Sequence, residues 1–173
     1  MTQLTLICDA GSGDRPVFPD DPALGRRERA TASRADAAWS SPNTRAVQTA
    51  SVLGLAASLA PALRDCDYGR WTGRRLADVH REQPKALAAW IADPAAKPHG
   101  GESVTEVIGR VAGWLDERLR ERGHLVAVTV VIRAAIIYAL GAAPSSCARI
   151  DVAPLSRTVL THDGGSWRLR SHG

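Results

Sequence analysis

The sequence contains no apolar run that approaches the roughly 20 residues needed to cross a membrane. Its N-terminus lacks a basic segment followed by an apolar core, which is the pattern of a secretory signal peptide. Cysteine is scarce, and Cys8, Cys66 and Cys147 form an odd number in no metal-like spacing. These absences predict a protein of the reducing cytoplasm with no membrane partner.

The sequence also lacks a concentrated run of charge. Lys and Arg number 22 and Asp and Glu 18, which gives a formal net charge of +4, and the two signs are interleaved. Aromatic residues make up 5% of the chain and do not alternate with basic ones, so no nucleic-acid partner is expected. With 173 residues, 45% of them hydrophobic, the chain fits one domain over residues 1–173.

A buried strand with a polar tip stands near the N-terminus. Leu4 to Ile7 run into Cys8 and Asp9, and then into small residues over 10–13. Such a strand is typical of the carboxyl edge of a parallel sheet, where open α/β folds bind ligands. Residues 37–40 predict a second short strand, and residues 124–131 predict a central strand buried on both faces.

Helical patterns occupy much of the remaining chain. Ser103 followed by Glu106 is a capping box, and it opens a helix whose apolar stripe extends to Leu119. Proline-rich residues 12–36 are expected to be irregular apart from a short helix. Further helices are expected from about 43 to 54, over 76–82 and 84–92, and from about 133 to 140, and short strands over 150–152, 159–162 and 167–170.

Four stretches stand out besides the first strand. They are Ser-Pro-Asn-Thr-Arg-Ala-Val-Gln-Thr-Ala over 41–50, Leu-Arg-Asp-Cys-Asp-Tyr-Gly-Arg-Trp-Thr-Gly over 63–73, Gly-Gly-Glu-Ser over 100–103, and the apolar stretch over 126–136. In their order and approximate spacing they resemble the histidine phosphatase superfamily, the phosphoglycerate mutase-like proteins. The resemblance covers nearly the whole chain and implies an α/β fold, a three-layer α/β/α sandwich around a mostly parallel central sheet.

The resemblance also implies roles for particular residues. In this family a histidine accepts a phosphoryl group, arginines and a second histidine hold its oxygens, and a carboxylic acid protonates the leaving oxygen. By this resemblance Arg45, in the first turn of a helix, binds an anion, and Asp65 stands at the place of the general acid. Glu102 belongs to a loop over the site entrance, and Thr129 ends the second catalytic strand.

The chain differs from the family at the two strand tips that carry the family's catalytic histidines. The family signature Arg-His-Gly is replaced by Cys8-Asp9-Ala10. At the second strand tip the family has Thr or Ser, His, two small residues, two apolar residues and Arg, whereas here Thr129 is followed by Val130-Val131-Ile132 and Arg133. We interpret this difference as a two-residue deletion that also removes the second histidine. Ordinary phosphatase activity is therefore not expected.

A carboxylate at residue 9 changes the electrostatics of such a site. At about 4 Å from a unit of phosphate charge, it opposes binding by roughly 4 kcal/mol at an effective dielectric constant near 20. With Asp9, Asp65 and Glu102 near one pocket and Arg45 opposing them, the site is expected to prefer neutral or cationic small molecules. Carboxylates of this kind bind magnesium in some proteins, but nothing in the spacing singles out a metal, and no cofactor is predicted.

Two hypotheses from different classes follow, with residual phosphatase activity as a third. In the first, the chain is a retasked enzyme that performs a cyclisation, isomerisation, elimination or hydrolysis of a small metabolite. Its catalytic pair would be Asp9 and Asp65, and its substrate-binding residues Cys8, Arg45, Glu102 and Thr129. In the second, the chain is a pseudo-phosphatase, a binding or scaffold protein without catalysis.

Some residues keep a structural interpretation. Asp65 is equally consistent with a loop carboxylate that pairs with Arg64 or Arg70. His99 lies close to the expected mouth of the pocket, but a single loop histidine is usually exposed. His162 flanks the last hairpin turn, and it is expected to be structural. The oligomeric state is not indicated by the sequence.

Overall fold

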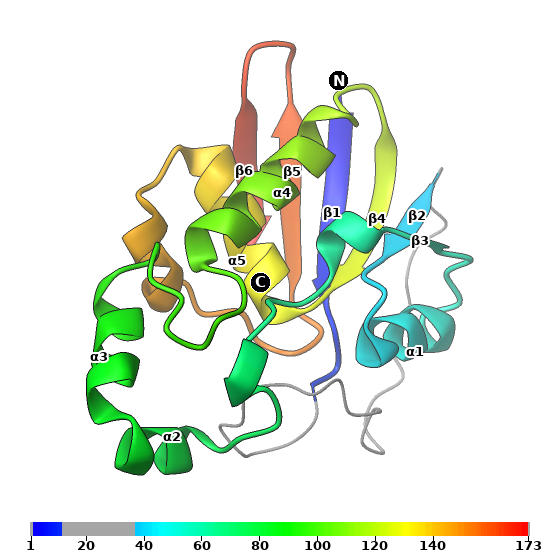
Figure 1. The fold of residues 1–173 in the computed structure, drawn as a ribbon. Coiled ribbons are helices and arrows are strands. Elements are labelled where there is room, and N and C mark those ends of the chain that lie inside the picture. Colours follow the sequence, from blue (N-terminus) through cyan, green and yellow to red (C-terminus); the bar gives the residue numbers. More distant parts are fainter. Residues whose placement is uncertain (1, 12–36, 173) are drawn as a thin grey trace.

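The computed structural model describes residues 2–11 and 37–172, and in this part six strands form one sheet (Figure 1). The strand order is β3-β2-β4-β1-β5-β6, in which the first four strands are parallel and β5 and β6 run antiparallel to their neighbours. The strands are β1 (Thr2–Cys8), β2 (Ala38–Ser40), β3 (Ser58–Leu59), β4 (Arg122–Ala127), β5 (Arg157–His162) and β6 (Trp167–His172). The predicted α/β fold with a mostly parallel sheet is confirmed.

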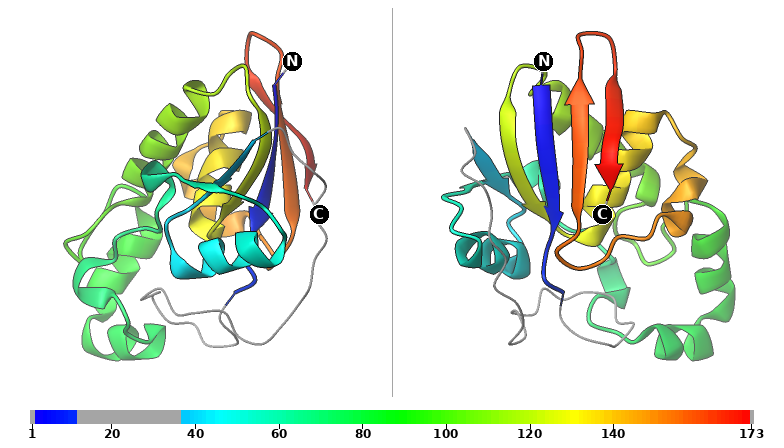
Figure 2. Two further views of the ribbon diagram at one scale, coloured as in Figure 1. Left: turned by 90° about the vertical axis from the view of Figure 1, so that its right-hand side faces the viewer. Right: turned by 180° about the vertical axis from the view of Figure 1, so that it is seen from behind.

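Helices pack against this sheet, with α4 and α5 together on one face (Figure 2). Within the described ranges no helix is long and apolar enough to span a membrane. The helices are α1 (Thr44–Val52), α2 (Leu76–Glu82), α3 (Pro84–Ala92), α4 (Val104–Asp116) and α5 (Thr129–Leu140), and short 3₁₀ turns cover Pro61–Leu63, Gly69–Trp71 and Pro144–Arg149. The short helix expected within residues 12–36 lies outside the described residues.

The alternation of side chains along β1 explains the layers. Leu6 and Cys8 point to one face and join the main core with α4 and α5. Ile7 points to the opposite face, where it packs against Ala46 and Ala50 of α1. The sheet therefore separates two apolar cores, as the predicted three-layer sandwich requires.

The junction between β4 and α5 differs from the prediction of a strand over 124–131. The strand β4 ends at Ala127, and α5 begins at Thr129, with Val128 at the N-cap position. Val131 and Ile132 are fully buried in the main core as helical residues. Burial against neighbouring elements therefore outweighs the strand preference of these β-branched side chains.

A predicted strand is absent, and some other bounds differ: β5 and β6 are each two residues longer than predicted. Residues 150–152 form no strand, and the carbonyl of Ile150 accepts a hydrogen bond from Arg133 Nε (2.7 Å). The helix α4 ends at Asp116, so Leu119 lies beyond it and is exposed. The bounds of α2 and α3, the capping box of α4 and the turn between β5 and β6 agree with the sequence analysis.

Residues 72–98, which we call the α2–α3 excursion, lead away from the sheet and return to it (Figure 1). Close backbone packing joins its two ends. A Cβ atom on Gly69, whose φ is +48°, would lie 2.3 Å from the carbonyl oxygen of His99, and a Cβ on Gly101 would lie 2.1 Å from that of Asp67. Only glycine permits this approach, and we call the two glycines and their partners the glycine clasp.

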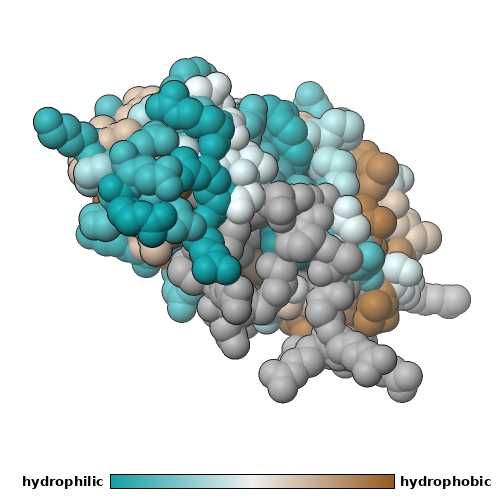
Figure 3. Space-filling view, turned by 60° about the horizontal axis from the view of Figure 1, so that its bottom comes forward, coloured by the Kyte–Doolittle hydropathy of each residue, from teal (hydrophilic) through white to brown (hydrophobic). Residues whose placement is uncertain are grey.

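On the face shown in Figure 3, hydrophobic residues gather on the right-hand side, where α1 lies, and hydrophilic residues dominate the left. The exposed apolar side chains of α1 and β3 are Val47, Val52 and Leu59. In the described sheet β3 is an edge strand of two residues. Such a short edge offers little backbone for pairing with another sheet.

Candidate functional site

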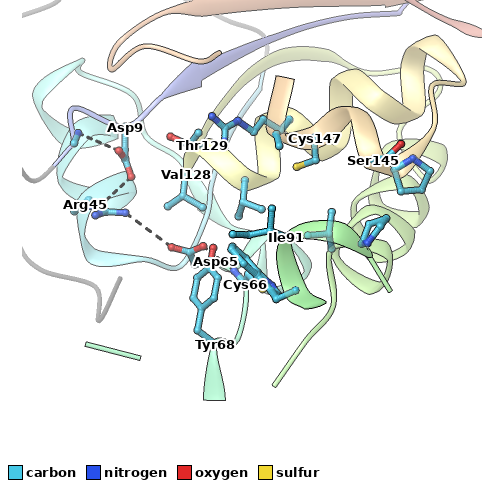
Figure 4. Close-up of a pocket in the computed structure, with 18 residues that line it drawn as sticks. Asp9, Arg45, Asp65, Cys66, Tyr68, Ile91, Val128, Thr129, Ser145 and Cys147 are labelled. Atoms are coloured by element: carbon cyan, nitrogen blue, oxygen red, sulfur yellow. Dashed lines mark hydrogen bonds and ion pairs between the residues drawn. The ribbon is translucent and has the colours of Figure 1, made fainter. Parts of the chain in front are cut away.

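A cavity of about 380 Å³ opens at the carboxyl ends of β1 and β4 (Figure 4). This is the edge of the sheet where the sequence analysis placed the ligand site. The described residues that line it are Asp9, Gly11, Arg45, Asp65, Cys66, Tyr68, Trp90, Ile91, Pro94, Val104, Val128, Thr129, Val130, Arg133, Pro144, Ser145, Cys147 and Ala148. Four of the six predicted site residues are therefore brought together here: Asp9, Arg45, Asp65 and Thr129.

Asp9, Arg45 and Asp65 form an ion-pair cluster at one end of the cavity (Figure 4). The Asp9 side chain is buried, its Oδ1 accepts a hydrogen bond from the N–H of Gly11 (3.0 Å), and its Oδ2 accepts one from Arg45 Nε (3.2 Å). Arg45 Nη2 lies 3.9 Å from Asp65 Oδ2. A single guanidinium group thus faces two carboxylates.

Asn43 explains how the Asp65 loop is placed beside α1. It occupies the N-cap position of α1, but its side chain makes no capping hydrogen bond. Its Oδ1 instead accepts hydrogen bonds from the backbone N–H of Asp65 (2.8 Å) and from the hydroxyl of Ser41 (2.5 Å). The start of α1 and the loop that carries Asp65 are therefore held at one point.

Asp65 is a carboxyl group of the cavity whose pKa is shifted to a value close to neutral pH. Burial raises its pKa from 3.8 to about 6. The N–H of Cys66, which donates to Oδ1 (2.7 Å), and the charge of Arg45 act in the opposite direction, whereas the charge of Asp9 raises the pKa further. Asp65 therefore exchanges its proton close to neutral pH.

Glu102 is not among the residues that line the cavity. Arg110 of α4 binds both of its carboxylate oxygens (2.7 and 3.0 Å), and Arg64 lies 3.2 Å from one of them. Arg110 also donates to the carbonyl oxygens of Ala62 and Asp65. Glu102 therefore fixes the Asp65 loop to α4, and the place at the ligand predicted for it is not observed. Arg64 pairs with Glu102 and not with Asp65.

Cys8 faces the core and does not line the cavity. Its Sγ lies 3.6 Å from Oγ1 of Thr129, the first residue of α5. Burial raises the pKa of the Cys8 thiol to about 11. A thiol with this pKa is protonated at neutral pH and is a poor nucleophile. Cys8 therefore contacts Thr129 from the core and is not itself a cavity-lining residue.

Arg133 lines the cavity, and the sequence analysis missed it. It stands one turn after Thr129 on the same face of α5, and it is half-buried. With Arg133 included and Glu102 removed, the described lining carries the two guanidinium groups of Arg45 and Arg133 and two carboxylates. The predicted excess of negative charge is therefore not found among these residues.

The apolar wall of the cavity was also missed. Except for Val128, which directly follows β4, it consists of side chains from elements that are distant from the strand tips in sequence. The main contributors are Trp90 and Ile91 of α3, Pro94, Val104 and Val128. Periodicity identifies α3 as a helix, but it does not show that this helix returns to the carboxyl edge of the sheet.

None of the five histidines of the sequence is among the described residues that line the cavity. His162 lies at the end of β5, its ring centroid is 5.2 Å from that of Trp167, and its Nδ1 accepts a hydrogen bond from the N–H of Gly164. The structural role predicted for His162 at the hairpin turn is confirmed.

His99 is buried, although the sequence predicted that it would be exposed. Its ring centroid lies 6.0, 5.1 and 6.5 Å from those of Tyr68, Trp71 and Trp90. Its Nδ1 accepts a hydrogen bond from the N–H of Gly101 (3.0 Å), and burial lowers its pKa. These contacts make it part of the packing that supports the glycine clasp.

The observed start of α5 also removes the need for a deletion at the second strand tip. Counting back from Arg133 over two apolar residues and two further residues reaches Val128. In the family pattern described above, this place belongs to the histidine. Val128 stands between β4 and α5 and lines the cavity. Counted from Arg133, the junction has the length of the family pattern, so it does not require the two-residue deletion that we inferred by counting from Thr129.

Within the described ranges, no three His, Cys, Asp or Glu side chains are grouped so that they could hold a metal ion. The chemistry that the described side chains offer is therefore charge pairing at the ion-pair cluster, proton exchange at Asp65 and apolar contact along the wall.

Comparison with known sequences identifies relatives of this chain. Over 163 residues it is 31% identical to phosphoserine phosphatase 1 of Hydrogenobacter thermophilus, covering 82% of this chain and 77% of that protein. A bifunctional protein of Mycobacterium tuberculosis is 28% identical over 139 residues. That match covers 73% of this chain but only 38% of the relative.

Solved structures share the fold over almost the full chain. A mycobacterial glucosyl-3-phosphoglycerate phosphatase superposes with a TM-score of 0.80 at 22% identity, covering 97% of this chain and 96% of that one. Phosphoserine phosphatase of Entamoeba histolytica superposes with a TM-score of 0.82 at 17% identity, covering 100% and 97%. The sequence profile of the histidine phosphatase superfamily, branch 1, matches residues 23–173. The chain therefore belongs to the histidine phosphatase superfamily.

Proposed function

We propose that this chain binds a small metabolite in the cavity and does not transfer phosphoryl groups through a histidine. The observation that carries this proposal is the ion-pair cluster. The Asp9 carboxylate, which the resemblance places at the position of the family's nucleophilic histidine, is buried against Arg45 and the backbone of Gly11. A carboxylate held in this way neutralises the arginine that would otherwise bind a phosphate.

The electrostatics of the cluster support the same proposal. Arg45 already faces Asp9 and Asp65, so a phosphate at this end would lie beside two carboxylates. Each like-charge contact at about 4 Å costs roughly 4 kcal/mol at an effective dielectric constant near 20. The apolar wall, in contrast, offers contact area to the body of a ligand whatever its charge.

The first test concerns phosphatase activity. Because relatives are named for phosphoserine and glucosyl-3-phosphoglycerate, these esters and p-nitrophenyl phosphate are the substrates to assay. We expect the full chain to release phosphate no faster than its Arg45→Ala variant does. Turnover of any of these esters that is lost in Arg45→Ala would overturn the proposal.

The second test concerns ligand binding. A metabolite library is screened by thermal shift against the wild type, against Val130→Trp, which fills the cavity, and against Leu140→Trp, an exposed position on the same helix. We expect some metabolites to raise the Tm of the wild type and of Leu140→Trp but not that of Val130→Trp. Equal shifts in all three proteins, or no shift in any, would contradict a ligand site in the cavity.

A second candidate function is favoured by one observation, the pKa of about 6 at Asp65. A carboxyl group that exchanges its proton near neutral pH suits general acid–base catalysis. Asp9, engaged by Arg45 and Gly11, is less suited to this role than the sequence analysis expected. If a bound metabolite is converted, Asp65→Asn should abolish turnover and retain binding. Recovery of every bound metabolite unchanged would exclude this candidate.

A further inference from the structure

Arg133 differs from Arg45 in its charge environment. Its Nε donates to the carbonyl oxygen of Ile150 (2.7 Å), and within the part of the chain that the structure describes it forms no ion pair with a carboxylate. The side chain is half-buried and lines the cavity. A guanidinium group that is partly removed from water is stabilised by an anion, and the carbonyl contact fixes its orientation.

Arg133 is held beside the turn over residues 144–149, because its Nε donates to the carbonyl oxygen of Ile150, the residue that follows this turn. Its charge lowers the pKa of Cys147 in the turn, and also those of Cys8 and Tyr68. In Figure 4, Ser145 and Cys147 lie on the side of the cavity opposite to Asp9 and Arg45, with Ile91 between them. The cavity therefore has the ion-pair cluster on one side, apolar walls, and a second region near Arg133 that lacks a protein anion among the described residues.

We propose that the ligand is a small molecule with an apolar body and a single carboxylate, and that Arg133 binds this carboxylate on the side of the cavity away from the ion-pair cluster. This inference rests on the proposed ligand-binding function and names the class of ligand. A carboxylate is favoured over a phosphate because Asp9 and Asp65 line the same cavity and repel a dianion more strongly than a monoanion. The apolar body contacts Trp90, Ile91 and Val128.

Three probes with one body and different head groups test this assignment. They are 4-phenylbutanoate, 4-phenylbutan-1-ol and 4-phenylbutyl phosphate, and their affinities are measured by calorimetry at fixed ionic strength. We expect the wild type to bind the carboxylate about tenfold more tightly than the alcohol, as a charge-assisted hydrogen bond provides. The phosphate is expected to bind more weakly than the carboxylate.

Two variants locate the effect. Arg133→Gln keeps a side chain that can donate to Ile150 and removes the charge, so it should bind carboxylate and alcohol within about twofold of each other. Arg149→Gln removes an exposed cation from the neighbouring turn, outside the cavity lining, and should keep the wild-type preference. Circular dichroism of each variant confirms that it is folded.

A labelling experiment on the wild type does not depend on the stability of a variant. Cys147 is half-buried, whereas Cys8 and Cys66 are buried, so iodoacetamide should modify Cys147 first. The carboxylate probe should slow this modification more than the alcohol does at equal concentration. Mass spectrometry of the digested protein gives the rate at each cysteine.

The outcomes separate the two proposals. Equal affinity for carboxylate and alcohol in the wild type, or an unchanged preference in Arg133→Gln, would overturn the assignment to Arg133 and leave ligand binding in the cavity intact. Tighter binding of the phosphate would overturn the choice of a carboxylate. Failure of all three probes to bind at millimolar concentration would reject this ligand class, and the library screen with Val130→Trp then decides separately on the proposed function.

Discussion

At the scale of single residues, the buried pair of Asp9 and Arg45 determines the character of the site. Only small fractions of both side chains are exposed, 4% for Asp9 and 10% for Arg45. Two charges in such a place are tolerated because each balances the other, and removal of Asp9 takes from Arg45 the nearer of the two carboxylates that it faces. Asp9 therefore has a structural role whatever the ligand is.

Substitution of Asp9 by Asn should destabilise the protein by about 3 kcal/mol, because Arg45 then loses its closest counter-ion in a buried environment. Urea unfolding at pH 7 measures this change. Asp163→Asn, which breaks an exposed pair with Arg168, is the control and should change the free energy of unfolding much less. A loss for Asp9→Asn no larger than that of the control would contradict the expected role.

The raised pKa of Asp65 should make the free energy of unfolding depend on pH. The carboxyl titrates near 3.8 when unfolded and near 6 in the folded protein, so between these values the folded state holds more protons. Raising the pH from 4 to 7 should therefore cost the wild type about 2 kcal/mol relative to Asp65→Asn, with almost no further change above pH 7. The difference in unfolding free energy between the two proteins, followed by urea titration, measures it. A difference that is independent of pH would show that Asp65 has an ordinary pKa.

How far the site could be predicted depends on whether a residue's environment is local. Asp9 follows a buried strand and Arg45 opens a helix within a family pattern, so their positions could be predicted from neighbouring residues. Glu102 could not be placed, because its partner Arg110 is reached only when α4 packs beside the Asp65 loop. Arg133 was missed because its orientation depends on where α5 begins.

At the scale of elements, the two helices that follow turns near the site start in different ways. The start of α4 is marked by a capping box, in which Ser103 Oγ accepts from the N–H of Glu106 (3.2 Å) and Glu106 Oε2 accepts from the N–H of Ser103 (2.7 Å). The start of α5 has Val128 at the N-cap position and no capping side chain. This contrast explains why the sequence analysis located the first boundary and not the second, since a run of β-branched residues without a cap resembles a strand.

Ser103→Ala should lower the free energy of unfolding by about 1 kcal/mol, since it leaves the N–H of Glu106 without its capping partner. Chemical unfolding at neutral pH provides the measurement. Ser51→Ala, an exposed substitution inside α1, should change stability by less than about 0.5 kcal/mol. Equal effects of the two substitutions would argue against a contribution from the capping box.

At the scale of the whole molecule, the glycine clasp connects the α2–α3 excursion to the sheet. Gly101→Ala should destabilise the protein by more than about 2 kcal/mol, because the new Cβ would lie 2.1 Å from the carbonyl oxygen of Asp67 and the backbone must move. Gly109 on α4 has open space around it, so Gly109→Ala should stabilise the helix by about 0.5–1 kcal/mol.

Thermal unfolding of both variants gives the signs, and hydrogen exchange shows where Gly101→Ala acts. Faster exchange should be confined to α2, α3 and the loops that join them to the clasp. Exchange that rises equally in the central strands would show that the glycine clasp stabilises the whole fold and not the α2–α3 excursion alone.

The glycine clasp also fixes where the two ends of the α2–α3 excursion meet. Because residues 72–98 leave and rejoin the molecule at neighbouring points, a change within them need not move the elements on either side. The α2–α3 excursion carries the apolar lining residues Trp90, Ile91 and Pro94. The sheet and its flanking helices carry the charged lining residues Asp9, Arg45 and Arg133. The shape that a ligand must match and the charges that it must meet can therefore evolve separately.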